Sequence, residues 1–315
     1  MNAANAPVPD TFGEKLRAGR FVMTAEMVPP VSCDAQDLLR KAVPLRGLAD
    51  AVNVTDGAGA RAHMSALAAA AILLGAGIEP ILQITCRDKN RIALQSELMG
   101  AAALGVGNLL LLTGDDPKAG DQPDAKPVFD IDARMLLESA RRLRDEGVLP
   151  TGRKVAGKAA FFLGAVDSPI DPPAGWQPFG LREKIAAGAQ FAQTQFCMDA
   201  AVVRRYIATL AQAGLTRQLA ILIGVNPLRS AKSALWIRYH LPGAIIPDAL
   251  IARMDKAADP IREGIGICIE LIEELAAIPG VAGVHIMAPG NDAAIPEVIA
   301  AVRDRVRKAT VVGGA

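Results

Sequence analysis

Residues suited to acid–base chemistry lie at the ends of short apolar segments of this chain. The first is Glu26, in the sequence TAEMVPP, where apolar residues and two prolines surround the carboxyl. Such a carboxyl is partly withdrawn from water and can hold a proton near pH 7 as a general acid. A buried acid paired with an Arg or Lys of the core gives the same pattern, and the sequence leaves both interpretations open.

Two further polar residues follow the same pattern. Asp115 comes directly after LLLLTG, where Gly114 permits a tight turn and the close approach of a flat ligand. Asp115 fits a helix or turn cap equally well. Gln195, in QTQFCMD, offers both a donor and an acceptor, which suits the amide-like edge of a ring such as a pterin.

These residues need a fold that brings strand ends together. Apolar segments of strand length alternate with longer helical segments, which is typical of a parallel sheet covered on both faces. The strands are expected at Phe21–Met27, Ala51–Thr55, Pro80–Thr85, Asn108–Thr113, Ala159–Ala165, Phe191–Phe196, Leu219–Ile223 and Gly283–Met287. The helices are expected at Asp34–Leu48, Ala62–Leu74, Asn90–Leu104, Ile131–Glu146, Leu181–Ala189, Ala200–Ala213, Pro260–Ile278 and Pro296–Arg307. Eight such units favour an α/β fold, a single (β/α)8 TIM barrel, over an open doubly wound sheet.

Two polar, proline-rich segments interrupt this repeat. Pro117–Pro127 follows the fourth strand and Pro169–Pro178 follows the fifth. Both come after the carboxyl ends of strands, the end of a (β/α)8 barrel at which active sites are built. Each segment is therefore either an active-site loop or an ordinary surface loop. The polar residues at the strand ends are expected to converge at this end of the barrel.

The composition limits the class of protein. The 315 residues are 51% hydrophobic and 21% charged, which is typical of a globular chain and excludes disorder, collagen and coiled coil. The net charge of +1 predicts neither nucleic acid nor an anionic membrane as a partner. We expect residues 1–315 to form one catalytic domain with no regulatory domain, to act on a small molecule and to assemble as a homo-oligomer.

The N-terminus and the cysteines bear on the compartment. The first twenty residues lack the basic start and apolar core of a signal peptide, and no segment is long enough to span a membrane, so a cytoplasmic protein is expected. The four cysteines lie far apart without a CxxC pair, which indicates free thiols in a reducing compartment. They are Cys33, Cys86, Cys197 and Cys268.

Several motifs are incomplete. Gly57, Gly59 and Ala62 match G-x-G-x-x-A after a strand, but the acidic residue downstream, Glu79, precedes the next strand instead of ending it, which argues against dinucleotide binding of the Rossmann kind. Gly152–Lys158 matches GxxxxGK without the hydroxyl residue of a P-loop, and it precedes a strand. The three histidines show no ligand spacing, so no metal site is expected. They are His63, His240 and His285.

Five segments in order resemble one known family. They are TAEMVPP, NVTDGAG, QITCRDKN, LLLLTGDDP and REKIAAGAQFAQTQFCMD, and they span about Phe21 to Pro227. Together they look like the methylenetetrahydrofolate reductase family. The resemblance implies a (β/α)8 barrel that binds FAD, takes hydride from NADH or NADPH, and reduces 5,10-methylenetetrahydrofolate to 5-methyltetrahydrofolate for methionine biosynthesis.

The resemblance also implies roles for single residues. Glu26 matches the acid that protonates a folate nitrogen and opens the methylene bridge. Asp115 matches the acid of the family's Gly-Asp turn, between flavin and pterin, and Gln195 matches a folate-contacting glutamine. Three further flavin-contact positions, the last of them suited to a phosphate, are Thr55, Gly114 and Lys184.

The chain departs from the better-known bacterial members at several cofactor positions. Asp56, Gln83 and Thr113 stand where those proteins carry Tyr, His and Arg. Gly164–Pro169, GAVDSP, replaces a segment with Tyr and His flavin contacts, and an Arg for the folate tail is missing near Asn291. Weak FAD binding is therefore expected.

Two alternatives keep the fold and change the function. One is a flavin-free folate enzyme that transfers hydride directly or transfers a one-carbon group. The other is a non-catalytic folate-binding subunit, against which Glu26, Asp115 and Gln195 argue together, because binding alone needs no proton donor.

Overall fold

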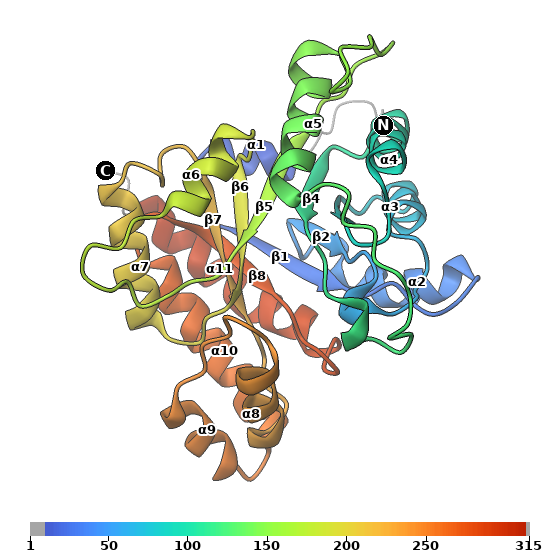
Figure 1. Ribbon diagram of the computed structural model, residues 1–315. Helices are drawn as coiled ribbons and strands as arrows, with labels where there is room; N and C mark the ends of the chain where they lie inside the picture. The colour runs from blue at the N-terminus through green and yellow to red at the C-terminus, as the bar shows by residue number, and fades with distance from the viewer. Residues whose placement is uncertain (1–9, 313–315) are drawn as a thin grey trace, which may run out of the picture.

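The computed structural model describes residues 10–312, with side chains as far as Val306. Eight parallel strands close into a barrel in which each strand pairs with its sequence neighbours and β8 pairs with β1 (Figure 1). The strands are β1 (Val22–Met27), β2 (Ala51–Val54), β3 (Pro80–Thr85), β4 (Asn108–Leu112), β5 (Phe162–Asp167), β6 (Phe191–Phe196), β7 (Ala220–Val225) and β8 (Val281–Ile286). The predicted (β/α)8 barrel is thereby confirmed.

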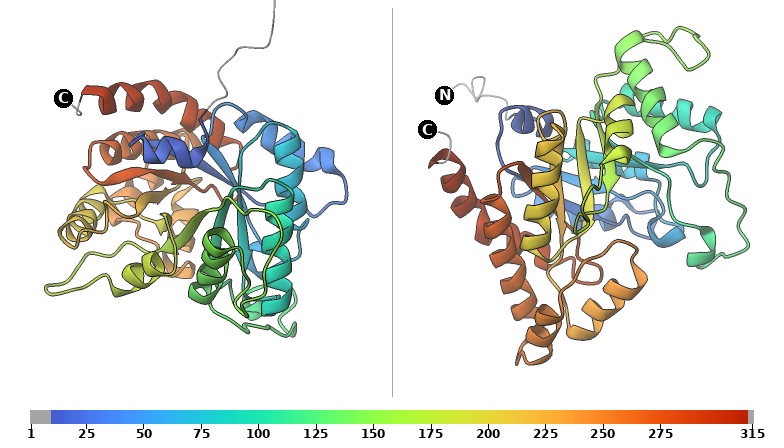
Figure 2. Two further views of the ribbon diagram at one scale, coloured as in Figure 1. Left: turned by 90° about the horizontal axis from the view of Figure 1, so that it is seen from above. Right: turned by 60° about the vertical axis from the view of Figure 1, so that its left-hand side comes forward.

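Helices surround the barrel and extend it at both ends. They are α1 (Phe12–Arg17), α2 (Ala35–Ala42), α3 (Ala66–Gly75), α4 (Arg91–Ala103), α5 (Ala133–Glu146), α6 (Phe179–Ala186), α7 (Ala200–Gln212), α8 (Ala231–His240), α9 (Asp248–Asp255), α10 (Pro260–Ala276) and α11 (Ala294–Val312). Three short 3-10 turns are η2 (Val43–Leu45), η3 (Ala58–Ala60) and η4 (Pro117–Ala119). α1 lies across the amino ends of the strands, and α8 and α9 extend from the opposite end (Figures 1 and 2).

The sequence placed most elements within a few residues but was wrong in three places. The fifth strand begins at Phe162 and not at Ala159, because its pairing with β4 begins only at Asn108–Phe162. α1 was missed because it has only six residues. α8 and α9 were missed because they form an extra helical pair between β7 and α10, where the regular repeat has one helix.

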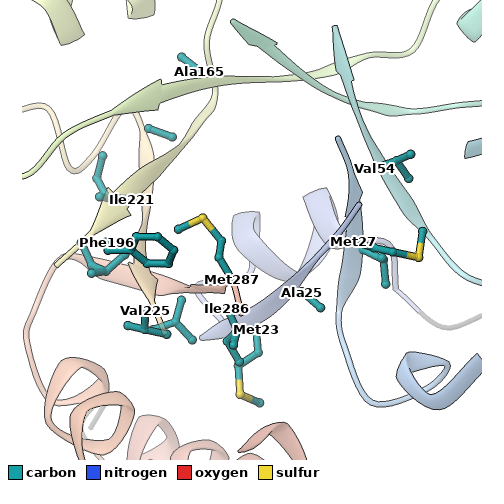
Figure 3. Packing of buried hydrophobic residues seen from close by; sticks show 14 of the residues in the cluster. Met23, Ala25, Met27, Val54, Ala165, Phe196, Ile221, Val225, Ile286 and Met287 are labelled. Atoms are coloured by element: carbon teal, nitrogen blue, oxygen red, sulfur yellow. The ribbon is translucent and has the colours of Figure 1, made fainter. Parts of the chain in front are cut away.

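Alternation along the strands separates two packing layers. Most residues of the strands that face the helices are apolar, such as Met23, Ala25 and Met27 of β1, and belong to one large cluster (Figure 3). The residues that face the barrel axis begin with a second, smaller cluster at the amino ends of the strands. Because successive side chains of a strand point to opposite faces, one strand serves both layers.

The second cluster closes the amino end of the barrel. Phe162 and Phe191 stack with ring centroids 5.2 Å apart, and Phe12 of α1 meets both rings edge-on. Phe12 is fully buried. α1 therefore acts as a plug that leaves the opposite end for ligands.

The plug is held by a buried carboxylate. Glu79 accepts hydrogen bonds from the backbone N–H of Phe12 at 2.9 and 3.0 Å and from Asn108 Nδ2 at 2.8 Å. Burial raises the pKa of Glu79 above its ordinary value, and this outweighs the opposite effect of the hydrogen bonds from Asn108 and Phe12. Glu79 therefore binds its proton more tightly in the folded protein than in the unfolded chain.

This raised pKa predicts a pH-dependent mutant. The stability that the proton contributes at Glu79 is present below the ordinary glutamate pKa and is lost as the pH rises through the raised value. Relative to wild type, Glu79→Gln should become more stable as the pH rises from about 4 to about 7. Urea unfolding across that range measures the difference.

Glu14 on α1 provides a control, because its pKa is shifted in the opposite direction to that of Glu79. Hydrogen bonds from the backbone and hydroxyl of Thr11 lower the pKa of the exposed Glu14. Glu14→Gln should therefore lose stability relative to wild type as the pH rises. If the stability of both variants relative to wild type changed with pH in the same direction, burial would not be what sets the pKa of Glu79.

Three of the four cysteines are buried and all four are free thiols. Burial raises the pKa of Cys86 to about 11 and that of Cys197 to about 12, so neither supplies a thiolate near neutral pH.

Across residues 10–312, none of the helices has the length and apolar character needed to cross a membrane.

Candidate active site

The polar residues predicted from strand ends lie at one end of the barrel. Glu26 is on β1, Thr55 directly follows β2, Asp115 lies in the turn after β4, and Gln195 is on β6. Each is at or near the carboxyl end of its strand, opposite the α1 plug. Glu26 and Gln195 therefore lie at the same end, as the fold hypothesis requires.

Within the described part of the chain, Glu26 has a histidine neighbour and no Arg or Lys partner of the kind that the alternative interpretation required. Its Oε2 lies 3.6 Å from His285 Nε2. The Glu26 side chain is 23% exposed, whereas the His285 side chain is only 3% exposed. The carboxyl thus stands at the boundary between the barrel interior and its open end.

Below Glu26, four buried polar side chains cross the barrel. Thr24 Oγ1 lies 3.0 Å from His285 Nδ1, and Gln193 Nε2 donates to Thr24 Oγ1, also at 3.0 Å. Gln193 and Asn53 exchange two hydrogen bonds, Asn53 Nδ2 to Gln193 Oε1 at 2.5 Å and Gln193 Nε2 to Asn53 Oδ1 at 3.0 Å. We call Thr24, Asn53, Gln193 and His285 the polar layer.

Above the polar layer, several groups keep unused hydrogen-bonding capacity. The buried Thr55 hydroxyl has no hydrogen-bond partner within the described part of the chain, and neither has the buried Nδ2 of Asn226. Gln195 uses its Oε1 to accept from the Phe196 backbone N–H at 3.0 Å, which leaves its amide N–H groups as donors. Buried polar groups are normally paired, so unpaired ones at a barrel mouth indicate a place for a ligand.

The Gly-Asp turn after β4 has a backbone that only glycine tolerates well. Gly114 has φ +94°, and a Cβ there would lie 3.0 Å from Thr85 Cβ and 3.1 Å from Arg87 Cβ. Asp115 and Thr113 are exposed. The cap of the following η4 turn is Asp116, which accepts from the Lys118 N–H, so Asp115 does not take the capping role.

Asp56 is engaged by the protein itself. Its Oδ2 accepts from the Thr85 backbone N–H at 2.9 Å and from Lys89 Nζ at 2.8 Å, and Lys89 also pairs with Glu97. Burial of Lys89 opposes its charge, but Asp56 and Glu97 together raise its pKa above the ordinary value. This ion pair fastens the loop after β2 to the loop after β3.

Arg87 also connects the loops at this end of the barrel, and the sequence did not indicate this role. It is only 4% exposed, and its guanidinium donates to the Gly57 carbonyl at 3.1 Å and to Asp88. Its own carbonyl accepts from the Val128 N–H at 2.7 Å. Arg87 therefore joins the loops that follow β2, β3 and β4.

Lys184, predicted as a phosphate partner, already has contacts within the protein. Its Nζ donates to the Val166 carbonyl at 2.6 Å and lies 3.6 Å from Asp167. Asp167 also accepts a hydrogen bond from the hydroxyl of the buried Tyr206. A phosphate at Lys184 would have to compete with these contacts.

His285 and Asn226 are site residues that the sequence reasoning did not find. The available signal was alternation: Gly283 and His285 share one face of β8, while Val284 and Ile286 belong to the cluster under the helices. On β7, Leu222 belongs to the inward cluster, so Asn226 has the same parity. Among residues 10–312 no three His, Cys, Asp or Glu side chains are grouped to hold a metal ion.

The fold and the site define a class of protein: a (β/α)8 barrel with a carboxylic acid and amide donors at the carboxyl ends of its strands. Comparison of the sequence with known protein families identifies the family. The sequence profile of the methylenetetrahydrofolate reductase family matches residues 11–303, and the chain belongs to that family.

A curated relative from Caenorhabditis elegans is named probable methylenetetrahydrofolate reductase (NADPH). It is 25% identical over 236 residues, which cover 73% of this chain. The chain spans about a third of that relative's length, since the match covers 33% of it.

Solved structures share the fold at low sequence identity. A Clostridium thermocellum protein described as binding two copies of 5-methyl-5,6,7,8-tetrahydrofolic acid has a TM-score of 0.65 at 13% identity, covering 93% of this chain and 98% of its own. DmoA from Hyphomicrobium sulfonivorans has a TM-score of 0.56 at 13% identity, over 91% and 88%. EDTA monooxygenase from Chelativorans has 0.56 at 15%, over 91% and 94%.

The crowding at Gly114 makes a testable prediction. Gly114→Ala should lower the free energy of unfolding by about 1–3 kcal/mol more than Gly152→Ala does. Gly152 has a similar φ of +83° with no atom within 4 Å of an added Cβ, so it isolates the conformational cost from the clash. Chemical unfolding of both variants gives the comparison, and equal losses would mean that the turn accommodates a side chain.

Proposed function

We propose that this protein reduces 5,10-methylenetetrahydrofolate to 5-methyltetrahydrofolate with hydride from NADH or NADPH, through a bound flavin. The observation that carries the proposal is the partly buried Glu26 carboxyl at the mouth of the barrel of a methylenetetrahydrofolate reductase family member. The shared fold of the Clostridium thermocellum protein, which is described as binding a reduced folate, agrees with the proposed substrate class.

In this proposal Glu26 donates the proton that opens the folate methylene bridge. Protonating one bridge nitrogen breaks its bond to the methylene carbon, and the electron pair of that bond stays on the nitrogen. The carbon becomes an iminium that accepts hydride and ends as the methyl group. A proton donor has to lie within hydrogen-bonding reach of that nitrogen, and a partly exposed carboxyl at the mouth meets this need.

Gln195 and Asp115 have the complementary role of holding the substrate. The free amide N–H groups of Gln195 suit the carbonyl and ring nitrogens of a pterin, while the exposed carboxylate of Asp115 suits its N–H groups. A carboxylate near the pterin also favours the positive charge of the iminium.

The residues present fit a flavin in part. The Thr55 hydroxyl, which has no hydrogen-bond partner among residues 10–312, the glycine backbone at Gly114 and the buried carboxamide of Gln83 would contact its ring system. A bound flavin would supply the two-electron relay between the nicotinamide and the folate. The contacts that occupy Lys184 and Asp56 agree with weak binding.

Thr55→Val tests this assignment with two opposite effects. Valine keeps the shape of threonine but removes the unpaired buried hydroxyl, so the free protein should become slightly more stable. The affinity for FAD should fall about 5- to 15-fold, the loss of one hydrogen bond. Thermal unfolding and calorimetric titration with FAD measure the two quantities, and an unchanged FAD affinity would exclude Thr55 as a flavin contact.

Glu26→Gln should separate the two halves of the reaction. Glutamine keeps the size and hydrogen bonding of the side chain but cannot deliver the proton, so the folate-dependent step should slow by roughly 10²- to 10⁴-fold. The step that consumes NAD(P)H needs no acid there and should change little. Stopped-flow absorbance of each step decides between these outcomes, with the exposed Glu138→Gln as the matched control. A wild-type rate for the folate step would shift the proton donor to Asp115.

The contacts of Lys184 favour a second candidate, a flavin-free folate reductase with direct hydride transfer. In that case Lys184 keeps its bonds to Val166 and Asp167 and has no phosphate to hold. The flavin absorbance of the purified protein discriminates, because full reductase activity without FAD binding would establish the flavin-free enzyme.

A further inference from the structure

We propose that His285 is a positioning residue that decides which oxygen of Glu26 keeps the acid proton, and that Thr24 sets the required tautomer of His285. This inference rests on the proposed role of Glu26.

Gln193 fixes the direction of the first bond. Gln193 Nε2 has two N–H groups and three acceptors nearby: Thr24 Oγ1 and Asn53 Oδ1, each at 3.0 Å, and His285 Nδ1 at 3.5 Å. The two shorter contacts use its two hydrogens. The Asn53 amide in turn donates to Gln193 Oε1 at 2.5 Å, which holds the Gln193 carboxamide in this orientation. Thr24 Oγ1 is therefore an acceptor from Gln193 and has one hydrogen of its own to donate.

Thr24 gives that hydrogen to His285. His285 Nδ1 is 3.0 Å from Thr24 Oγ1, whereas the competing acceptor, the Val284 carbonyl, is 3.4 Å away. An Nδ1 that accepts a hydrogen bond has no hydrogen, so the neutral imidazole has its hydrogen on Nε2. That atom faces Glu26 Oε2.

The tautomer matters because a carboxylic acid has one proton and two oxygens. An Nε2–H that donates to Oε2 leaves the acid proton on Oε1, available to the folate nitrogen. The opposite tautomer presents a bare Nε2 that would accept the proton and withdraw it from the substrate. The 3.6 Å separation exceeds a hydrogen bond, and such catalytic contacts commonly tighten only when substrate binds.

The proton balance is simple in this scheme. Glu26 loses one proton to the folate nitrogen, and His285 stays neutral with its Nε2–H on the new carboxylate. No proton needs to pass through the buried layer, because Nδ1 stays bonded to Thr24.

The tautomer can be observed without any ligand. The chain has three histidines, so a 15N imidazole NMR spectrum contains few signals, and His285→Asn identifies the signals of His285. We expect a protonated Nε2 and an unprotonated Nδ1 in wild type, and a loss of this preference in Thr24→Val. A protonated Nδ1 in the wild-type spectrum would overturn the inference.

A pair of substitutions tests the effect on Glu26. The Gln amide reaches about as far as His Nε2, whereas the Asn amide reaches only as far as Nδ1. His285→Gln should therefore keep a donor for Glu26 and retain the folate-dependent step, while His285→Asn should slow that step by about 10- to 100-fold. The NAD(P)H-consuming step should be unchanged in both.

Thermal unfolding of the two variants monitors packing. Equal slowing by Asn and Gln would mean that His285 only fills space, and the inference would fail. A wild-type protein without any reductase activity would overturn the proposed function itself, whereas the NMR spectrum would still decide the tautomer.

Discussion

The interior of a closed eight-stranded barrel holds only a few layers of side chains, and this constraint governs the whole molecule. Here the layer at the amino ends is aromatic and sealed by Phe12 of α1. The polar layer lies in the middle, and the mouth layer holds Glu26. A polar residue in the middle of such a barrel has no access to bulk water, so it has to find its partner on another strand.

Each member of the polar layer has a hydrogen-bond partner on another strand. Asn53 and Gln193, from strands on opposite sides of the barrel, satisfy each other through two hydrogen bonds. Such a network is rigid, because rotating one member leaves a buried group unpaired. Above it, the Thr55 hydroxyl and the Asn226 Nδ2 have no hydrogen-bond partner among the residues that the structure describes. A rigid, hydrogen-bonded layer below unpaired polar groups is what a site preorganised for a polar ligand requires.

Side-chain ion pairs and hydrogen bonds connect the loops around the mouth to each other. The Asp56–Lys89–Glu97 cluster and the buried Arg87 guanidinium link the segments that follow β2, β3 and β4. This arrangement explains why the Asp56 carboxylate is occupied by protein contacts, whereas Lys184 is held separately, by the Val166 carbonyl and Asp167. A flavin contact predicted at either residue has to displace an existing ion pair or hydrogen bond.

The sequence by itself determined the barrel, its eight strands and the end at which Glu26, Thr55, Asp115 and Gln195 lie, because parallel strands place their carboxyl ends together whatever the details of packing. It determined neither α1 nor the α8–α9 pair, which are too short or too irregular for a periodic signal. The partner of Glu26 was decided only by tertiary structure. β1 and β8 stand some 260 residues apart in sequence, and only closure of the barrel brings Thr24 and His285 into register. No local pattern encodes that contact.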